Sequence, residues 1–261
     1  MQFKLRHQET KGLNCYGEIF WNVDVDDFEN IDFNGSTWID EFRGMVSKVI
    51  SKNGSIQKRF IEILTEYLIN GSLDSVSPHR VSMEQRLSSG DWLLSAEFFI
   101  LGHEYGHLIL GHLSDEAAPV RCAVGNMQVE IFSKSHSDEL WADMFGAAIV
   151  IKWSINDKSA QDHPSLLPNL LCGPTLFFEC SNLIERSLQL FPKYIKKREN
   201  THPESSVRNK RVNDLLFNLI GDTQHRQATL IKIILHELYS SMQSDLRKAF
   251  SSAGRPAFIW S

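Results

Sequence analysis

The stretch from Asp91 to Leu113, DWLLSAEFFILGHEYGHLILGHL, constrains this chain most, because it places the spacing HExxH inside an apolar segment of helical length. Residues four apart lie one above the other on an α-helix, so His103 and His107 can direct ring nitrogens at one metal ion. Glu104 flanks the same face. Two histidines and a glutamate in this order are typical of a catalytic zinc site. The sequence therefore predicts a zinc-binding helix here.

The composition predicts a globular protein with a substantial hydrophobic core. The chain has 261 residues, of which 42% are hydrophobic, and its glycines and prolines are scattered. A formal net charge of -5 argues against a nucleic-acid partner, since nucleic-acid-binding domains usually carry a basic excess. Glu97 and Glu237 interrupt two of the most apolar windows, so we expect no membrane span.

The cysteines and the N-terminal sequence together predict a cytoplasmic location. The start of the chain, MQFKLRHQET, lacks the apolar core of a signal peptide. No CxxC pair and no disulfide-dense spacing occur among the four cysteines, which are Cys15, Cys122, Cys172 and Cys180. We therefore expect reduced thiols in a soluble, cytoplasmic protein.

The sequence of the first third of the chain predicts helices with a structural rather than a catalytic role. Two amphipathic helices separated by Asn53-Gly54 are expected in residues 37–71. A serine-rich connection follows at residues 71–90 and is the best place for a domain boundary. We therefore expect an N-terminal helical subdomain at residues 1–88 and a zinc metallopeptidase domain at residues 89–261.

A β-hairpin is predicted after the HExxH helix. The strand-like runs VRCAV and MQVEIF flank Gly125-Asn126, a two-residue turn of the kind that closes a hairpin. A hairpin beside the metal could hold an extended peptide by adding it as a further strand. It could equally do no more than cover the core, and the sequence leaves both interpretations open.

A third metal ligand is expected on the next helix, which the segment SHSDELWADMFGAAIVIKW predicts. Glu139 and Asp143 lie four residues apart on one face of that helix. A carboxylate ligand at Glu139 would give a His, His, Glu site with a fourth position open for water. Asp143 could then orient a ligand imidazole from behind. His136 is the alternative third ligand in this segment.

Spacing argues against a third ligand on the HExxH helix itself. Leu110 and Leu113 stand where the long metzincin motif needs glycine and histidine. On a continuous helix, His112 sits about 140° around the axis from His107, so it points away from the metal. We therefore expect His112 to be a packed or hydrogen-bonded histidine rather than a ligand.

Three segments resemble the motifs of a peptidase family. HEYGHLILGHL, then ELWAD, then THPESSVR resemble the motifs HExxH, ExxxD and His-Pro-Ser-x-x-x-Arg of gluzincin peptidases of the HtpX and CAAX-prenyl-protease type. The soluble phage-exclusion peptidases of the Lit type are similar as well, and the ImmA/IrrE group is similar more distantly. The resemblance runs from the HExxH helix through Arg208. It implies a mainly α (α+β), zincin-like fold with a small sheet or hairpin beside the active helix.

The resemblance also implies roles for individual residues. It places a zinc ion on His103, His107 and Glu139, with Asp143 as the aspartate that supports a ligand. His202 and Arg208 match the histidine and arginine of the third motif, where the histidine stabilises the oxyanion of the tetrahedral intermediate.

The chain departs from the HtpX pattern in two ways. Glu204 stands where that family usually has serine, and no transmembrane helix is expected. We therefore do not expect the membrane-protein substrates of HtpX-type enzymes.

The expected function is that of a soluble zinc endopeptidase with a regulatory or defence role and a protein substrate. Glu104 would act as general base and then as proton donor to the leaving amine. The alternative is a catalytically idle zinc-binding module that regulates or binds a partner, and a third possibility is an enzyme that hydrolyses a non-peptide amide. An open fourth zinc position favours an enzyme, whereas closure by His136 favours a structural site.

Overall fold

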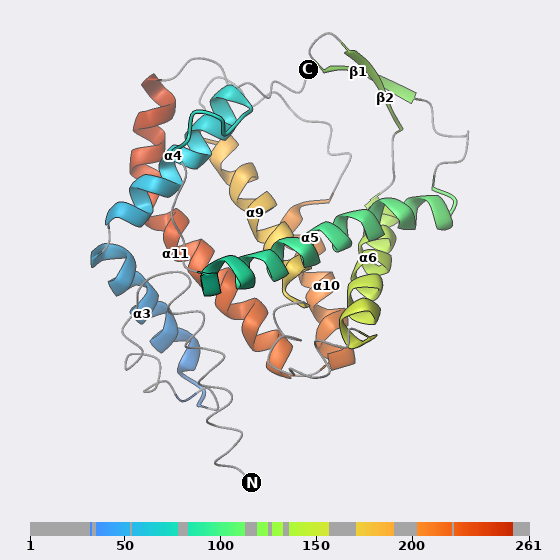
Figure 1. Ribbon diagram of the computed structural model, residues 1–261, viewed down its shortest axis with the longest axis horizontal. Helices are drawn as coiled ribbons and strands as arrows, with labels where there is room; N and C mark the ends of the chain where they lie inside the picture. Colours follow the sequence, from blue (N-terminus) through green and yellow to red (C-terminus); the bar gives the residue numbers. More distant parts are fainter. Residues whose placement is uncertain are drawn as a thin grey trace.

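The fold is mainly helical, as the sequence predicts (Figure 1). The computed structural model describes residues 32, 35–52, 54–77, 83–112, 119–124, 127–132, 136–156, 171–190, 203–220 and 222–252. The helices in these residues are α3 (Trp38–Lys52), α4 (Gly54–Asn70), α5 (Met83–Ile109), α6 (His136–Asn156), α9 (Gly173–Leu188), α10 (Ser205–Ile220) and α11 (Asp222–Ser252). None of these helices is long and apolar enough to cross a membrane.

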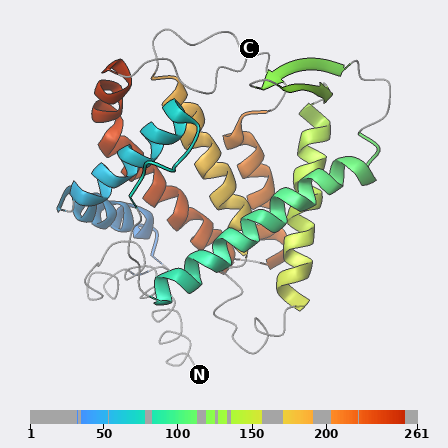
Figure 2. The same cartoon turned by 45° about the horizontal axis from the view of Figure 1, so that its top comes forward.

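Two hydrophobic clusters hold the helices together, and α9 contributes to both. The first cluster joins α3, α4, α9 and α11, and it includes Phe42, Leu68 and Leu183. The second joins α5, α6, α9 and α10 and includes Phe99 and Phe178. Figure 2 shows α9 between α11 and α10, with α5 crossing in front. The HExxH helix therefore rests on a buried scaffold rather than on loops.

Helices α3 and α4 both pack on α11. They agree with the two helices predicted in residues 37–71. The connection after α4 is shorter than the predicted range of residues 71–90, because α5 already begins at Met83. The boundary expected between residues 1–88 and 89–261 falls inside α5, and the division into two domains stays a prediction.

The strands β1 (Pro119–Val124) and β2 (Met127–Phe132) pair antiparallel. Their register sets Val124 opposite Met127, and the predicted turn residues between them lie outside the described residues. Both views place the hairpin toward the end of the molecule where α5 ends and α6 begins (Figures 1 and 2). Its use in substrate binding stays a prediction.

Helices α5 and α6 approach so closely that their backbones touch through glycines. A Cβ atom at Gly102 would lie 2.9 Å from the Cα atom of Gly146. A Cβ atom at Gly146 would lie 2.8 Å from the carbonyl oxygen of Phe99 and 2.9 Å from the amide nitrogen of His103. The missing side chains let the ligand-bearing faces of the two helices meet directly.

Replacing Gly146 with alanine is expected to lower the free energy of unfolding by about 1–3 kcal/mol, because the new methyl group overlaps backbone atoms of α5. Gly44 is the matched control, since it is exposed in α3 with no atom within 4 Å of an added Cβ. Gly44→Ala should instead stabilise the protein by about 0.5–1 kcal/mol through helix propensity. Urea unfolding of both variants measures the difference. Equal effects of the same sign would contradict the close approach.

A chain of buried and half-buried polar contacts fixes α10 against α9. The side-chain amide of Asn209 donates to Glu179 at 2.6 Å, and Asn213 donates to Asn209 at 2.8 Å. Thr175 donates to Asn213 at 2.9 Å. Asn209 follows Arg208 directly in α10, so these hydrogen bonds also fix the position of the helical turn that carries Arg208.

Glu179 gives this network a pH dependence. Burial raises the pKa of the Glu179 carboxyl, against the opposing effects of the Lys232 charge and of hydrogen bonds from Asn209 and Asn182. The folded state therefore binds this proton more tightly than the unfolded state does. The stability gained from protonated Glu179 is fully present below the ordinary glutamate pKa of 4.5. It is lost as the pH rises through the raised pKa of the folded state.

Replacing Glu179 with glutamine is expected to remove this loss, because the amide oxygen can still accept from Asn209 and carries no charge. The difference in unfolding free energy between the variant and the parent should grow in favour of the variant from pH 4.5 to neutral pH. Denaturant unfolding at a series of pH values measures this difference. Parallel curves for the two proteins would show that Glu179 titrates normally.

Candidate metal centre

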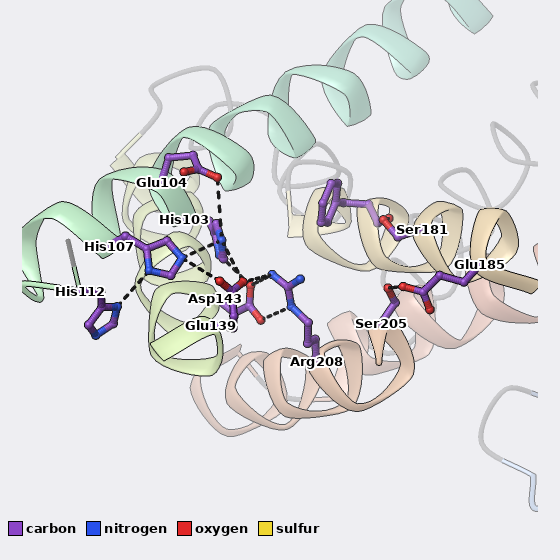
Figure 3. A network of polar contacts seen from close by, with 11 residues as sticks. His103, Glu104, His107, His112, Glu139, Asp143, Ser181, Glu185, Ser205 and Arg208 are labelled. Carbon is purple, nitrogen blue, oxygen red and sulfur yellow. Dashed lines mark hydrogen bonds and ion pairs between the residues drawn. The ribbon is translucent and has the colours of Figure 1, made fainter. Parts of the chain in front are cut away.

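The crossing of α5 and α6 brings three of the predicted ligands together (Figure 3). His103 and His107 lie on the inner face of α5, and Glu139 lies in the first turn of α6. Their exposed fractions are 8%, 0% and 1%. Polar side chains this well buried need partners, and here they have one another.

The spacing of the candidate ligand atoms is compatible with one metal ion. His103 Nε2 and His107 Nε2 lie 3.1 Å apart. Glu139 Oε2 lies 3.5 Å from His103 Nε2, and Glu139 Oε1 lies 3.4 Å from His107 Nε2. Two ligand atoms that are each about 2.0–2.2 Å from a tetrahedral ion lie about 3.3–3.6 Å apart. The two carboxylate distances, each to a different oxygen of Glu139, fall in this range, and the distance between the histidine nitrogens is slightly shorter. The residues present could hold a metal ion.

Glu104 lies beside the ligands without belonging to them. Its Oε1 atom is 4.0 Å from His103 Nε2, and its side chain is 65% exposed. Figure 3 shows it on the opposite side of His103 from Asp143 and Arg208. The carboxylate is therefore accessible to solvent next to the buried ligand set.

Asp143 orients the first histidine from behind. Its Oδ1 atom lies 2.9 Å from His103 Nδ1, which can donate its proton and leave Nε2 free to bind an ion. Asp143 is 1% exposed and lies one turn after Glu139 in α6. Asp143 is therefore placed where it could orient a ligand imidazole, and that role stays a prediction.

Arg208 reaches the same carboxylates from α10. Its Nε atom donates to Asp143 Oδ2 at 2.8 Å and its Nη2 atom donates to Asp143 Oδ1 at 2.7 Å. The same Nη2 atom lies 3.5 Å from Glu139 Oε2, and the guanidinium lies over the ring of Phe178. These contacts hold two buried carboxylates in place. A direct catalytic role for Arg208 stays a prediction.

The charge of Arg208 is secured by its surroundings. Burial alone would lower the pKa of the guanidinium, but the hydrogen bonds and charge of Asp143, with the charges of Glu139 and Glu185, raise that pKa overall. Arg208 therefore carries a positive charge next to the two carboxylates at neutral pH.

Three further residues named in the sequence analysis lie outside the buried cluster or outside the described residues. His202 lies outside the described residues, so its oxyanion role stays a prediction. Glu204 is exposed just before α10, and its carbonyl oxygen accepts from the Arg208 amide at 3.1 Å. His136, the alternative third ligand, is exposed at the start of α6 and is not part of the buried cluster.

The position of His112 differs from the one expected on a continuous helix. Helix α5 ends at Ile109 and is not continuous to His112, because Gly111 has a φ of 74° and turns the chain. His112 Nδ1 lies 3.0 Å from His107 Nδ1. The expected hydrogen-bonded histidine is confirmed, but the continuous helix on which the expectation rested is wrong, and the turn places His112 against His107. The glycine just after the last helical turn is the signal that could have shown this.

Comparison with known proteins gives no match for this chain. No protein-family model matches the chain, and no curated protein or solved structure matches it either. A functional proposal for this protein therefore rests on its own residues and their contacts.

Proposed function

We propose that this protein is a zinc-dependent endopeptidase of the gluzincin type. The observation that carries the proposal is the buried His103, His107 and Glu139 set with Glu104 exposed beside it. Two imidazoles and one carboxylate are the protein ligands of a common class of catalytic zinc site, in which water takes the fourth position. The motifs HExxH, ExxxD and His-Pro-x-x-x-x-Arg resemble those of HtpX-type and Lit-type peptidases in the same order.

His103, His107 and Glu139 would hold the ion, which when bound supplies a Lewis acid and a water of lowered pKa. Glu104 takes a proton from the attacking water as the water oxygen bonds to the carbonyl carbon. The carbon–nitrogen bond then breaks, and Glu104 returns the proton to the leaving amine. Asp143 keeps the His103 ring in the orientation that exposes Nε2 throughout.

The outer face of α5 supports a polypeptide as the substrate. Four apolar residues on this face are 41–66% exposed, and they lie before and after Glu104: Leu94, Leu101, Tyr105 and Leu108. A helix that is apolar on all sides is normally covered, and an exposed apolar patch beside a reactive group is typical of a binding surface. We infer a substrate segment with apolar side chains, cleaved in the cytoplasm in a regulatory or defence process.

The proposal is tested by comparing new protein N-termini in a host-cell extract. Purified protein is first analysed for zinc, and one zinc ion per chain is expected. The extract is then incubated with the zinc-loaded protein, with and without a zinc chelator, and the new N-termini are identified by mass spectrometry. A short set of chelator-sensitive cuts with apolar residues nearby is expected. A zinc-loaded protein that produces no cuts would contradict the peptidase and favour the partner-binding module.

A further inference from the structure

The second ligand histidine has a partner that the HExxH motif does not contain. His107 turns its Nε2 atom toward His103 and Glu139, and its Nδ1 atom lies 3.0 Å from His112 Nδ1. Figure 3 shows His112 on the side of His107 that faces away from the ligand set. Each ligand imidazole thus has a polar group behind it, Asp143 for His103 and His112 for His107.

The turn after α5 builds this contact. The His112 amide donates to the carbonyl oxygen of His107 at 2.9 Å, and the Gly111 amide donates to that of Leu108 at 3.3 Å. With Gly111 at a φ of 74°, these two bonds form a Schellman motif. The motif folds the chain back so that His112 lies against the same helical turn that carries His107. Its side chain is only 11% exposed.

The hydrogen-bond direction between the two histidines follows from the ligand role of His107. A ring nitrogen that faces a cation must present its lone pair, so the proton of a neutral His107 is on Nδ1. Nδ1 then donates to His112 Nδ1, which must be unprotonated. The proton of His112 is therefore on its Nε2 atom, which lies 3.6 Å from Asp138 Oδ1.

We propose that His112 is a positioning residue for the metal ligand His107, and that Asp138 in turn positions His112. His112 accepts the Nδ1 proton of His107, which fixes the tautomer and the ring plane that the metal needs. Asp138 directly precedes Glu139 in α6, so one helical turn supplies a ligand and a carboxylate that lies 3.6 Å from His112 Nε2. The inference rests on the proposed metal site but requires no peptidase activity.

Zinc affinity of the purified protein, measured against a competing chromophoric chelator, tests the role of His112. Partners behind a metal ligand typically change metal affinity about 10–100-fold, and a loss in this range is expected for His112→Ala. His112→Asn should recover most of the affinity, because its amide oxygen can lie near the position of Nδ1 and accept the same proton. Asp138→Asn should cause a smaller loss, because it acts only through His112.

The controls separate positioning from general destabilisation. His136→Ala removes an exposed histidine of the same helix as Asp138 and should leave zinc affinity unchanged. Melting of the metal-free proteins shows whether the His112 variants fold, and the cobalt-substituted spectrum should shift for His112→Ala and not for His112→Asn. Unchanged zinc affinity in His112→Ala, or an equal loss in His112→Asn, would overturn the proposal. A protein that binds zinc with this pattern but cleaves nothing supports the proposal and contradicts only the peptidase.

Discussion

The Glu104→Gln protein is expected to bind zinc like the parent protein and to hydrolyse substrate about 10²–10⁴-fold more slowly. Glutamine has the shape of glutamate but cannot take a proton from water near neutral pH. Metal binding should persist because Glu104 is not one of the three buried ligands and its side chain is 65% exposed. Zinc content and the initial rate of cleavage, measured on the same preparation, check both parts of this expectation.

Glu97→Gln is the matched control for this experiment. Glu97 is exposed on the same helix, two turns before Glu104 on the same face, so the substitution removes the same charge away from the ligands. Its hydrolysis rate should stay close to that of the parent. If Glu104→Gln retained full activity, the proposed general base would be wrong. If it lost zinc as well as activity, Glu104 would hold the ion rather than act on water.

Spacing along a helix was sufficient to predict which residues could share a metal site, although it left His136 as an alternative to Glu139. His103 and His107 share a face because they are one turn apart, and the same rule places Glu139 and Asp143 on one face of α6. The helical bounds near Asn53-Gly54 followed equally well from the glycine signal. These features can be predicted without knowing which helices contact one another.

Features that depend on contacts between distant segments could not be read from spacing. Arg208 meets Asp143 across 65 positions of sequence, and only the family resemblance placed it near the site. The contact of Gly102 with Gly146 depends on how α5 crosses α6. The contact of His112 with His107 was missed because the chain turns at Gly111, before the assumed helical periodicity reaches His112. In each case a tertiary contact or a single turn overrode the local pattern.

Arg208→Met is expected to lower the free energy of unfolding of the metal-free protein by about 3–5 kcal/mol. The substitution keeps much of the side-chain volume but removes the cation that two carboxylates share. Asp143 and Glu139 are each 1% exposed, so neither can regain water without opening the site. Chemical unfolding with and without zinc checks this expectation. Zinc should restore part of the lost stability, since a cation on Glu139 replaces part of the missing charge.

Lys210→Met is the control for the role of burial in the stability loss expected of Arg208→Met. Lys210 lies on the same helix and pairs with Asp214 at 2.9 Å, but their side chains are 79% and 61% exposed. Solvent screens such a pair, so its loss should cost at most about 1 kcal/mol. Adding Asp143→Asn to Arg208→Met should recover part of the loss, because the unpaired charge disappears with its partner. An Arg208→Met protein as stable as the Lys210→Met protein, but with slowed hydrolysis, would instead identify Arg208 as a residue that acts on the substrate.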